Sequence, residues 1–151
     1  MKLTRFSDIG LRVLMYLAKE VRSPAVTVAE VAVQFDVPHN HLVKVVGALA
    51  KMGWIDAVRG RNGGIRLAIE PEKLHIGVAL RVLEGNTELV DCEGLGCRLS
   101  GDCVLRNALR VGVEAFYDAM NQYTLADIVG GNVGEQIVQM HRVFLMDRAS
   151  V

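Results

Sequence analysis

The sequence is poor in several residue types, and each scarcity excludes a class of protein. It has three cysteines, three prolines and 5% aromatic residues among 151 residues. Three cysteines are too few for a disulfide-rich secreted domain. The best apolar run, Val13 to Ala18, ends at Lys19, whereas a membrane-spanning helix needs roughly 20 apolar residues. No secretion signal is recognisable, so we expect a cytoplasmic protein without a membrane partner.

Charge is balanced overall but unevenly distributed. Lysine plus arginine and aspartate plus glutamate number 17 each, while 51% of residues are hydrophobic. Residues 1–75 contain 11 basic and 7 acidic residues, whereas residues 76–151 contain 6 and 10. This asymmetry favours an N-terminal half that faces nucleic acid. The composition also supports a buried core, as in a folded domain.

The N-terminal half has the pattern of a helix-turn-helix. Residues 4–19 and 39–52 show helical spacing of apolar residues. Thr27 and Glu30 match a capping box at the start of a short intervening helix. The segment 36–38 predicts the turn, with its proline in the first helical position of the next helix. A short helix, a tight turn and a second helix are the parts that this motif requires.

The helix predicted at 39–52 has one polar stripe opposite an apolar stripe. At its start, His39, Asn40 and His41 are candidates for contacts with base edges, and Lys44 for contacts with phosphates. A helix face that only meets solvent would show the same pattern.

A basic hairpin is expected directly after this helix. Residues 54–59 and 65–69 have strand character, and between them an Asn-Gly turn is expected. Arg59, Arg61 and Asn62 lie at this turn, where arginine can enter a minor groove. The order of elements predicts a mainly α fold with a small β-hairpin wing, a winged helix-turn-helix. A plain surface hairpin is the alternative.

The cysteines form a compact C-x4-C-x5-C pattern. Cys92, Cys97 and Cys103 lie in a glycine-rich segment, residues 91–103, and Asp102 is expected to cap a helix whose first turn holds the third cysteine. These spacings are wider than those of common structural zinc sites and suit a loop around an iron–sulfur cluster. Zinc and a bare thiol sensor remain alternatives. A fourth ligand would have to come from elsewhere: this chain, a partner subunit or a small molecule.

Catalysis has little support in the sequence. The four histidines are scattered and have no evident orienting partner, which leaves a catalytic cysteine without a base. Paired carboxylates and a phosphate-binding loop are also lacking. We therefore expect a protein that is not an enzyme.

The C-terminal half predicts a long helix over residues 104–123. Small residues on its apolar stripe would allow a second copy to pack closely, which favours a homodimer over packing on its own domain alone. A short helix should begin at Thr124. The expected organisation is a DNA-binding domain (1–75), a cluster loop with a dimerisation helix (76–130), and a tail (131–151), either a loose helix or frayed, to which no function is assigned.

Together these motifs resemble the iron–sulfur winged-helix regulators of the IscR/NsrR family, over residues 1–130. The matching segments are Met1 to Asp8, the wing Val58 to Gly64, the three-cysteine loop, and Tyr123 to Asp127. The cysteine spacing and the Phe6-Ser7-Asp8 start are most similar to the nitric-oxide-responsive branch. The other branch has a histidine soon after the third cysteine, where this chain has Asn107 and no histidine nearby. Pro38 departs from the serine that many relatives carry at the start of the recognition helix.

The resemblance implies a cofactor, a partner and a signal. It implies a homodimer in which the three cysteines hold a [4Fe–4S] or a [2Fe–2S] cluster. Asp8 from the partner subunit would supply the fourth ligand and Arg12 would pair with it. The implied function is a repressor that binds a two-fold symmetric DNA operator and is released by nitric oxide. A regulator of iron or cluster supply, and a zinc-stabilised protein-interaction module, are the alternatives.

Overall fold

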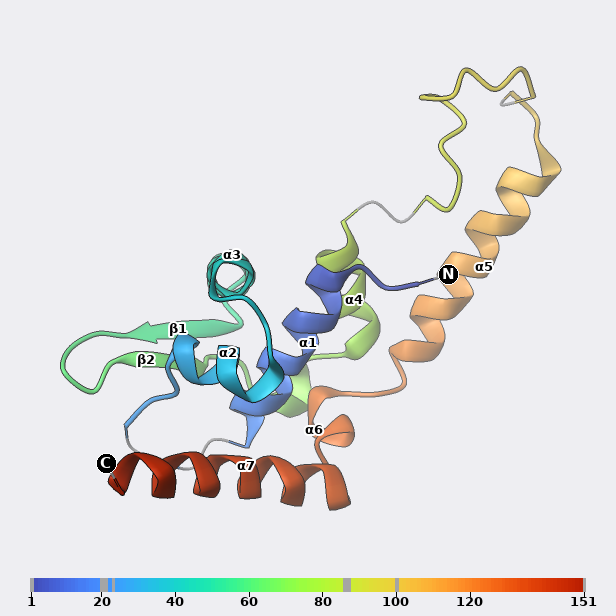
Figure 1. Cartoon of the computed structure of the whole chain (residues 1–151). Coiled ribbons are helices and arrows are strands. Elements are labelled where there is room, and N and C mark those ends of the chain that lie inside the picture. Colours follow the sequence, from blue (N-terminus) through green and yellow to red (C-terminus); the bar gives the residue numbers. More distant parts are fainter. Residues whose placement is uncertain (1, 20–21, 23, 86–87, 100, 151) are drawn as a thin grey trace.

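The computed structural model describes residues 2–19, 22, 24–85, 88–99 and 101–150. It is mainly helical with a two-stranded antiparallel sheet, as the sequence predicts (Figure 1). The elements in chain order are α1 (Arg5–Ala18), α2 (Val28–Phe35), α3 (His39–Lys51), β1 (Ile55–Val58), β2 (Gly64–Leu67), the 3-10 helix η1 (Pro71–Lys73), α4 (Ile76–Glu84), α5 (Val104–Met120), α6 (Leu125–Ile128) and α7 (Gly131–Ala149).

Helices α1, α2 and α3 form the helix-turn-helix unit, and α3 packs on both others. Thr4 caps α1 and Thr27 caps α2 through their hydroxyl groups. The turn begins at Asp36, which adopts the left-handed conformation (φ 49°, ψ 51°) and ends α2. Asp tolerates this conformation better than most residues. Pro38 is the N-cap of α3 and not its first helical residue, one position from where the sequence places it.

The hairpin is tied to the body by a third stretch of chain. Strands β1 and β2 pair in register from Ile55 with Leu67 to Val58 with Gly64. The amide of Ile65 also donates to the carbonyl of Val26, at 2.7 Å, which joins β2 to the segment that precedes α2. Strand β2 is therefore paired along both of its edges, with β1 on one side and Val26 on the other.

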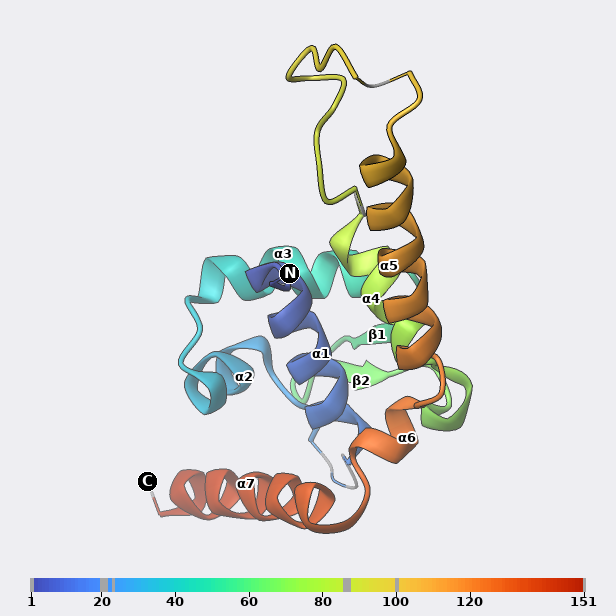
Figure 2. The same ribbon diagram turned by 90° about the vertical axis from the view of Figure 1, so that its right-hand side faces the viewer.

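Helix α4, which the sequence analysis did not assign, connects the N-terminal unit to α5. Gly77 lies where α4 meets the end of α5, and a Cβ there would stand 2.2 Å from the carbonyl oxygen of Tyr117. Only glycine fits so close an approach. Arg81 of α4 forms two hydrogen bonds with Glu114 of α5, at 2.9 and 2.6 Å. Beyond this contact α5 runs on to the cysteine loop, which projects from the body (Figure 2).

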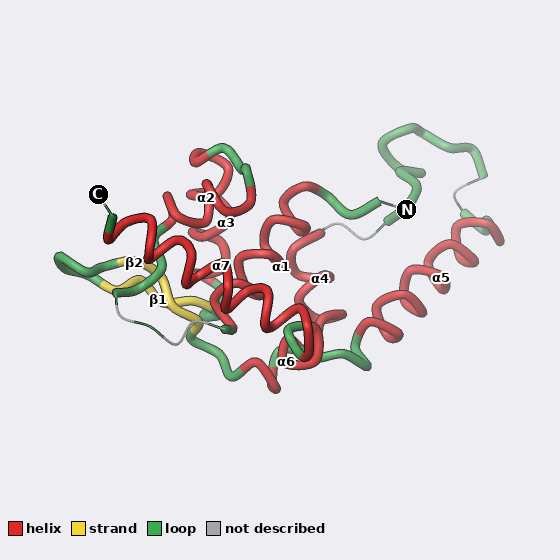
Figure 3. Tube along the Cα trace, turned by 60° about the horizontal axis from the view of Figure 1, so that its bottom comes forward, coloured by secondary structure: helices red, strands yellow, loops and turns green. Residues whose placement is uncertain are grey.

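Helix α7 is one continuous helix, so a loose or frayed tail was the wrong expectation. It lies against the N-terminal unit, close to the chain of α1 and α2 (Figure 3). Ile137 and His141 of α7 are buried. The hydrophobic core takes side chains from helices across the chain, from Ile9 in α1 to Ile137 in α7.

Candidate nucleic-acid interface and cysteine loop

The start of α3 presents its polar residues to solvent. His39, Asn40, His41 and Lys44 are all exposed. The opposite face is fixed in the core, where Leu42, Val45 and Leu49 are at most 1% exposed. This confirms the two stripes predicted for the helix and holds the polar face outward as a rigid unit. Such a face can meet base edges and phosphates in a major groove.

The wing exposes the three residues singled out from the sequence, although its turn differs from the one expected. Arg59, Arg61 and Asn62 are exposed in the loop of residues 59–63. The turn is closed by the amide of Gly63 donating to the carbonyl of Gly60, at 3.0 Å. The positive φ falls on Gly60 (106°). The prediction of an Asn-Gly turn was therefore off by one residue, because this hydrogen bond puts Arg61 and Asn62, and not Asn62 and Gly63, at the centre of the turn.

The hairpin directs its tip away from the rest of the molecule. Figure 1 views α3 along its axis and shows the hairpin running from its side, away from α4 and α5. The segment between Lys51 and Ile55 is short, so α3 and the wing emerge from adjacent parts of the chain. Basic side chains of both elements are thus available on the N-terminal unit.

The cysteine loop holds three free thiols near the start of α5. Cys92 and Cys103 are half-buried and Cys97 is exposed. The amide of Cys97 donates to the carbonyl of Cys92 at 3.0 Å, which folds the first spacing into a turn. Burial raises the pKa of the Cys92 thiol, and so do the charges of Cys97 and Cys103 nearby. The three sulfur donors thus lie on one glycine-rich segment, and the charges of Cys97 and Cys103 reach Cys92.

The third cysteine is the N-cap residue of α5, and its side chain makes no capping hydrogen bond. The expectation that Asp102 caps the helix is off by one residue. A cavity of about 420 Å³ adjoins Cys103 and is also lined by Asp102 and Arg106. Arg106 contacts Glu88 at 3.2 Å and Glu93 at 3.7 Å, which links the two ends of the loop.

Asp8 and Arg12 form the pair that the resemblance implies. The Nε of Arg12 donates to Oδ1 of Asp8 at 2.9 Å, one helical turn apart on α1, and both side chains are 50% exposed. Both residues line a cavity of about 380 Å³ between α1, α2 and α7, with Phe35 and Met140 among its other walls. In the part of the chain that is described, no three His, Cys, Asp or Glu side chains gather closely enough to hold a metal ion.

One face of α5 is apolar and open to solvent. Its side chains are Val104, Leu105, Ala108, Val111, Gly112, Ala115 and Ala119, all exposed. The opposite face packs on α4 through Val113 and Tyr117. Val78 and Val82 of α4 are also exposed, at 47% and 44%. Helix α4 was not among the elements predicted from the sequence, although the spacing of Ile76, Ala79, Leu80 and Leu83 indicates a helix.

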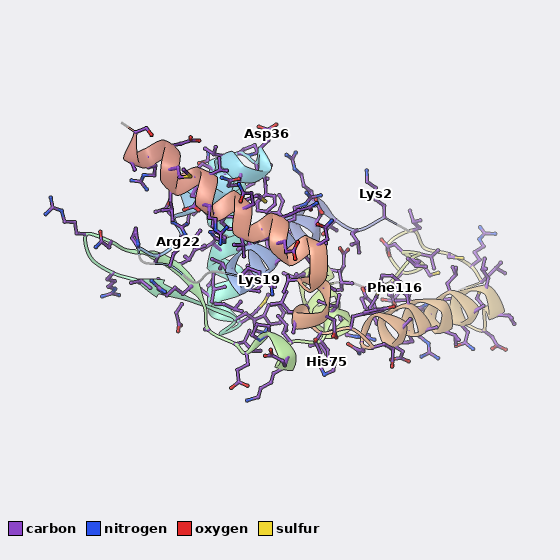
Figure 4. The ribbon with its side chains drawn as sticks, turned by 90° about the horizontal axis from the view of Figure 1, so that it is seen from below. Lys2, Lys19, Arg22, Asp36, His75 and Phe116 are labelled. Atoms are coloured by element: carbon purple, nitrogen blue, oxygen red, sulfur yellow. The ribbon has the colours of Figure 1, made fainter. Side chains whose placement is uncertain are left out.

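A buried polar cluster, which we call the Glu30 cluster, joins α1, α2 and α7. It consists of Tyr16, Arg22, Glu30 and His141. The Tyr16 hydroxyl donates to Oε1 of Glu30 at 2.6 Å, and Arg22 donates to the same oxygen. Arg22 also donates from Nε to Nδ1 of His141 at 3.2 Å. Figure 4 shows Arg22 and Lys19 alongside α7.

The Glu30 cluster corrects one expectation from the sequence. The Thr27 hydroxyl accepts from the Glu30 amide as a capping box requires. The Glu30 carboxylate points into the core, at 1% exposure, instead of returning to the Thr27 amide. Two residues distant in sequence, Tyr16 and Arg22, take this carboxylate as an acceptor. Burial lowers the pKa of His141, with the Arg22 charge acting in the same direction.

Among the described residues, no helix combines the length and apolarity needed to cross a membrane. Residues 3–131 match the Rrf2 family, described as an iron-dependent transcriptional regulator. The chain is 41% identical over 132 residues to the HTH-type transcriptional regulator NsrR of Bacillus licheniformis, covering 85% of this chain and 92% of that relative. It is also 41% identical to NsrR of Shouchella clausii, covering 85% of this chain and 89% of the relative.

Solved structures have the same fold. T. potens IscR superposes with a TM-score of 0.68 at 23% identity, covering 85% of this chain and 86% of that one. CymR, the global cysteine regulator of B. subtilis, gives 0.67 at 24% identity, covering 85% and 95%. These relatives are regulators and not enzymes, in agreement with the expectation from the sequence. The chain belongs to the Rrf2 family of transcriptional regulators.

Proposed function

We propose that the protein is a dimeric, DNA-binding repressor that senses nitric oxide through an iron–sulfur cluster. The observation that carries the proposal is the three-cysteine loop at the start of an exposed apolar helix, in a chain about 40% identical to regulators named NsrR. In this proposal residues 1–75 bind DNA, residues 76–130 hold the cluster and form the dimer interface, and residues 131–151 pack against the helix-turn-helix unit.

DNA binding is assigned to α3 and the wing. His39, Asn40 and His41 face the base edges of the major groove, and Lys44 faces the phosphates. Arg59, Arg61 and Asn62 of the wing enter the neighbouring minor groove, where the potential is most negative. The exposure of all seven side chains supports this assignment.

The dimer is assigned to the apolar face of α5. A contiguous exposed apolar face along a whole helix is typical of an interface. The small residues Ala108 and Gly112 allow a second helix to approach closely. A two-fold dimer matches a two-fold symmetric operator, whose half-sites must lie about 34–36 Å apart to be read from one face of DNA.

The donor set fits an iron–sulfur cluster. Three thiols on one glycine-rich loop are the ligand type that such clusters need. Cys92, Cys97 and Cys103 would hold the cluster, either [4Fe–4S] or [2Fe–2S], with Asp8 of the partner subunit as fourth ligand. The ion pair with Arg12 orients the Asp8 carboxylate on the exposed side of α1. When bound, the cluster would supply iron that reacts with nitric oxide.

Asp8 provides the link from this loop to DNA. While Asp8 is held by the cysteine loop of the other subunit, α1 of one subunit is fixed relative to α5 of the other. Release of Asp8 lets the two α3 helices leave their common register. Specific DNA binding is usually about 4–10 kcal/mol more favourable than non-specific binding. A change in the spacing of the two α3 helices that removes this difference is enough to release the operator.

The test is the visible spectrum and the iron and sulfide content of protein purified without oxygen. We expect a brown protein whose broad visible absorption changes on addition of nitric oxide, together with loss of DNA binding. Cys97→Ala should lose colour and iron. Asp8→Ala should keep iron but uncouple DNA release from nitric oxide. A colourless protein with one zinc per chain would contradict the proposal.

A second candidate is a regulator of iron or cluster supply that uses the same parts. The family description as iron-dependent favours it. A coloured protein whose spectrum and DNA binding ignore nitric oxide but follow iron supply would support this candidate instead.

A further inference from the structure

Two neighbouring residues on the exposed face of α3 carry no polar group. Val43 is 50% exposed, although valine gains from burial. Gly47 is exposed one turn further along, and a Cβ there would have no described atom within 4 Å. Residues four apart on a helix are neighbours on its surface. Val43 and Gly47 therefore form one flat apolar patch, which we call the Val43 patch.

Neither the backbone nor the packing of the described residues requires glycine at position 47. Its φ lies outside the range that side chains avoid, and the space beside it is open. Glycine in the middle of a helix destabilises it relative to alanine. Glycine at position 47 thus lowers the stability of the helix without a benefit to packing within the chain. Its benefit is the space that it leaves for another molecule that approaches α3.

The surroundings of the Val43 patch indicate which molecule approaches. Asn40, Lys44 and Lys51 flank it on the exposed side of α3. An amide and two cations beside an apolar surface are complementary to the major groove of DNA, where base edges lie between rows of phosphates. The thymine 5-methyl group is the apolar feature that this groove presents.

We propose that the Val43 patch reads the 5-methyl group of a thymine, with Gly47 leaving room for the base edge to approach the helix. This inference rests on the proposed DNA-binding function and names the base feature that α3 recognises. Val43 supplies the apolar contact with the methyl group, and Gly47 sets how closely α3 enters the groove.

The experiment uses a duplex that the full-length wild-type protein selects from a random-sequence DNA pool. Each thymine in it is replaced in turn by deoxyuridine, which lacks only the methyl group. At one position per half-site the affinity of the wild type should fall about fourfold, the factor for one buried methyl group. Val43→Ala should shrink this fourfold difference, because alanine keeps only one methyl group for the contact. Val33→Ala, at a 73% exposed valine on α2, is the matched control and should keep the fourfold difference.

Gly47→Ala gives an independent readout. Its melting temperature should rise by about 2–4 °C, as expected for removal of a helix-interior glycine. Its affinity for the selected duplex should nevertheless fall at least about tenfold. A more stable variant that binds as well as the wild type would overturn the role of Gly47.

The outcomes separate this inference from the proposed function. If the wild type selects a sequence but tolerates every deoxyuridine, or if Val43→Ala keeps the full thymine preference, the Val43 patch is not the methyl reader and DNA binding still stands. If the wild type enriches no sequence from the pool, both the inference and the proposed DNA binding fail.

Discussion

The imidazole ring of His141 stacks on the phenol ring of Tyr16, with their centroids 3.9 Å apart and their planes 22° from parallel. The two residues are 125 positions apart in the chain. Arg22 can only donate, so Nδ1 of His141 accepts its hydrogen bond and Nε2 donates to the carbonyl oxygen of Tyr16, at 3.0 Å. This arrangement suits a neutral imidazole, because a proton on Nδ1 would oppose the Arg22 guanidinium.

Stability should therefore depend on pH through His141. Its pKa is lowered in the folded protein, chiefly by burial, whereas the unfolded chain takes up the proton near pH 6.5. Below about pH 6.5 the unfolded state binds more protons, so the free energy of unfolding falls as pH falls, by at most about 1.4 kcal/mol per pH unit. Above that range this contribution is constant.

Urea unfolding between pH 7.5 and 5.5, at fixed protein concentration, measures this dependence. His141→Gln should flatten the slope, while His39→Gln, on the exposed start of α3, should keep the slope of the wild type. Equal slopes for the wild type and His141→Gln would show that another group is responsible.

Removing the hydroxyl of Tyr16 should destabilise the folded protein, because this hydroxyl is part of the buried Glu30 cluster. Tyr16→Phe keeps the ring but deletes the 2.6 Å hydrogen bond to Glu30. Oε2 of this buried carboxylate has no hydrogen-bond partner among the residues that the structure describes, so these residues offer little compensation. We expect a loss of about 1.5–3 kcal/mol in the free energy of unfolding, the range for hydrogen bonds to charged groups. Tyr123→Phe, at a 53% exposed tyrosine, should change it by less than about 0.5 kcal/mol.

A charge on the apolar face of α5 should prevent dimerisation. Ala108→Glu places a carboxylate on that face, where association would bury it without a partner. Asn107→Glu adds the same charge beside Arg110 on the adjoining polar side and is the control. Sedimentation equilibrium should give a monomer for the first variant and the mass of the wild type for the second. Two dimeric variants would place the interface elsewhere.

The wing should contribute to DNA affinity through phosphate charge. Arg61→Ala should reduce the slope of log K against log salt by about 1, the value for one neutralised phosphate. Arg110→Ala, on α5, should leave the slope unchanged. A normal salt dependence in Arg61→Ala would mean that the wing does not lie on the DNA.

Sequence patterns predicted the helices and strands that are determined by residues close together in the chain. The apolar spacing around Leu42, Val45 and Leu49 located α3, and the hydroxyls of Thr27 and Thr124 marked two helix starts that the structure confirms. The hairpin was placed correctly, but its turn was not. Both Asn62-Gly63 and Gly60 favour a turn, and only the pairing of Val58 with Gly64 decides between them.

Features that depend on distant residues could not be predicted in this way. Val133, Ile137, Met140 and Phe144 of α7 recur at helical spacing, which indicates a helix. The spacing does not say that this helix packs on α1 and α2. Glu30 fits a capping box by spacing alone, and its burial depends on Tyr16 and Arg22 from other segments. The cysteine spacing indicated a ligand set, while a ligand from a second subunit has no signature in the order of residues along one chain.

The Glu30 cluster also bears on how the protein is made. Arg22 and His141 are 119 positions apart, and at about 5–20 residues per second a ribosome needs roughly 6–24 s to travel between them. During that time the nascent helix-turn-helix has its acidic core residue but lacks the imidazole that covers it. The helix-turn-helix unit thus completes its core only after α7 has been synthesised, which delays its maturation until most of the chain exists.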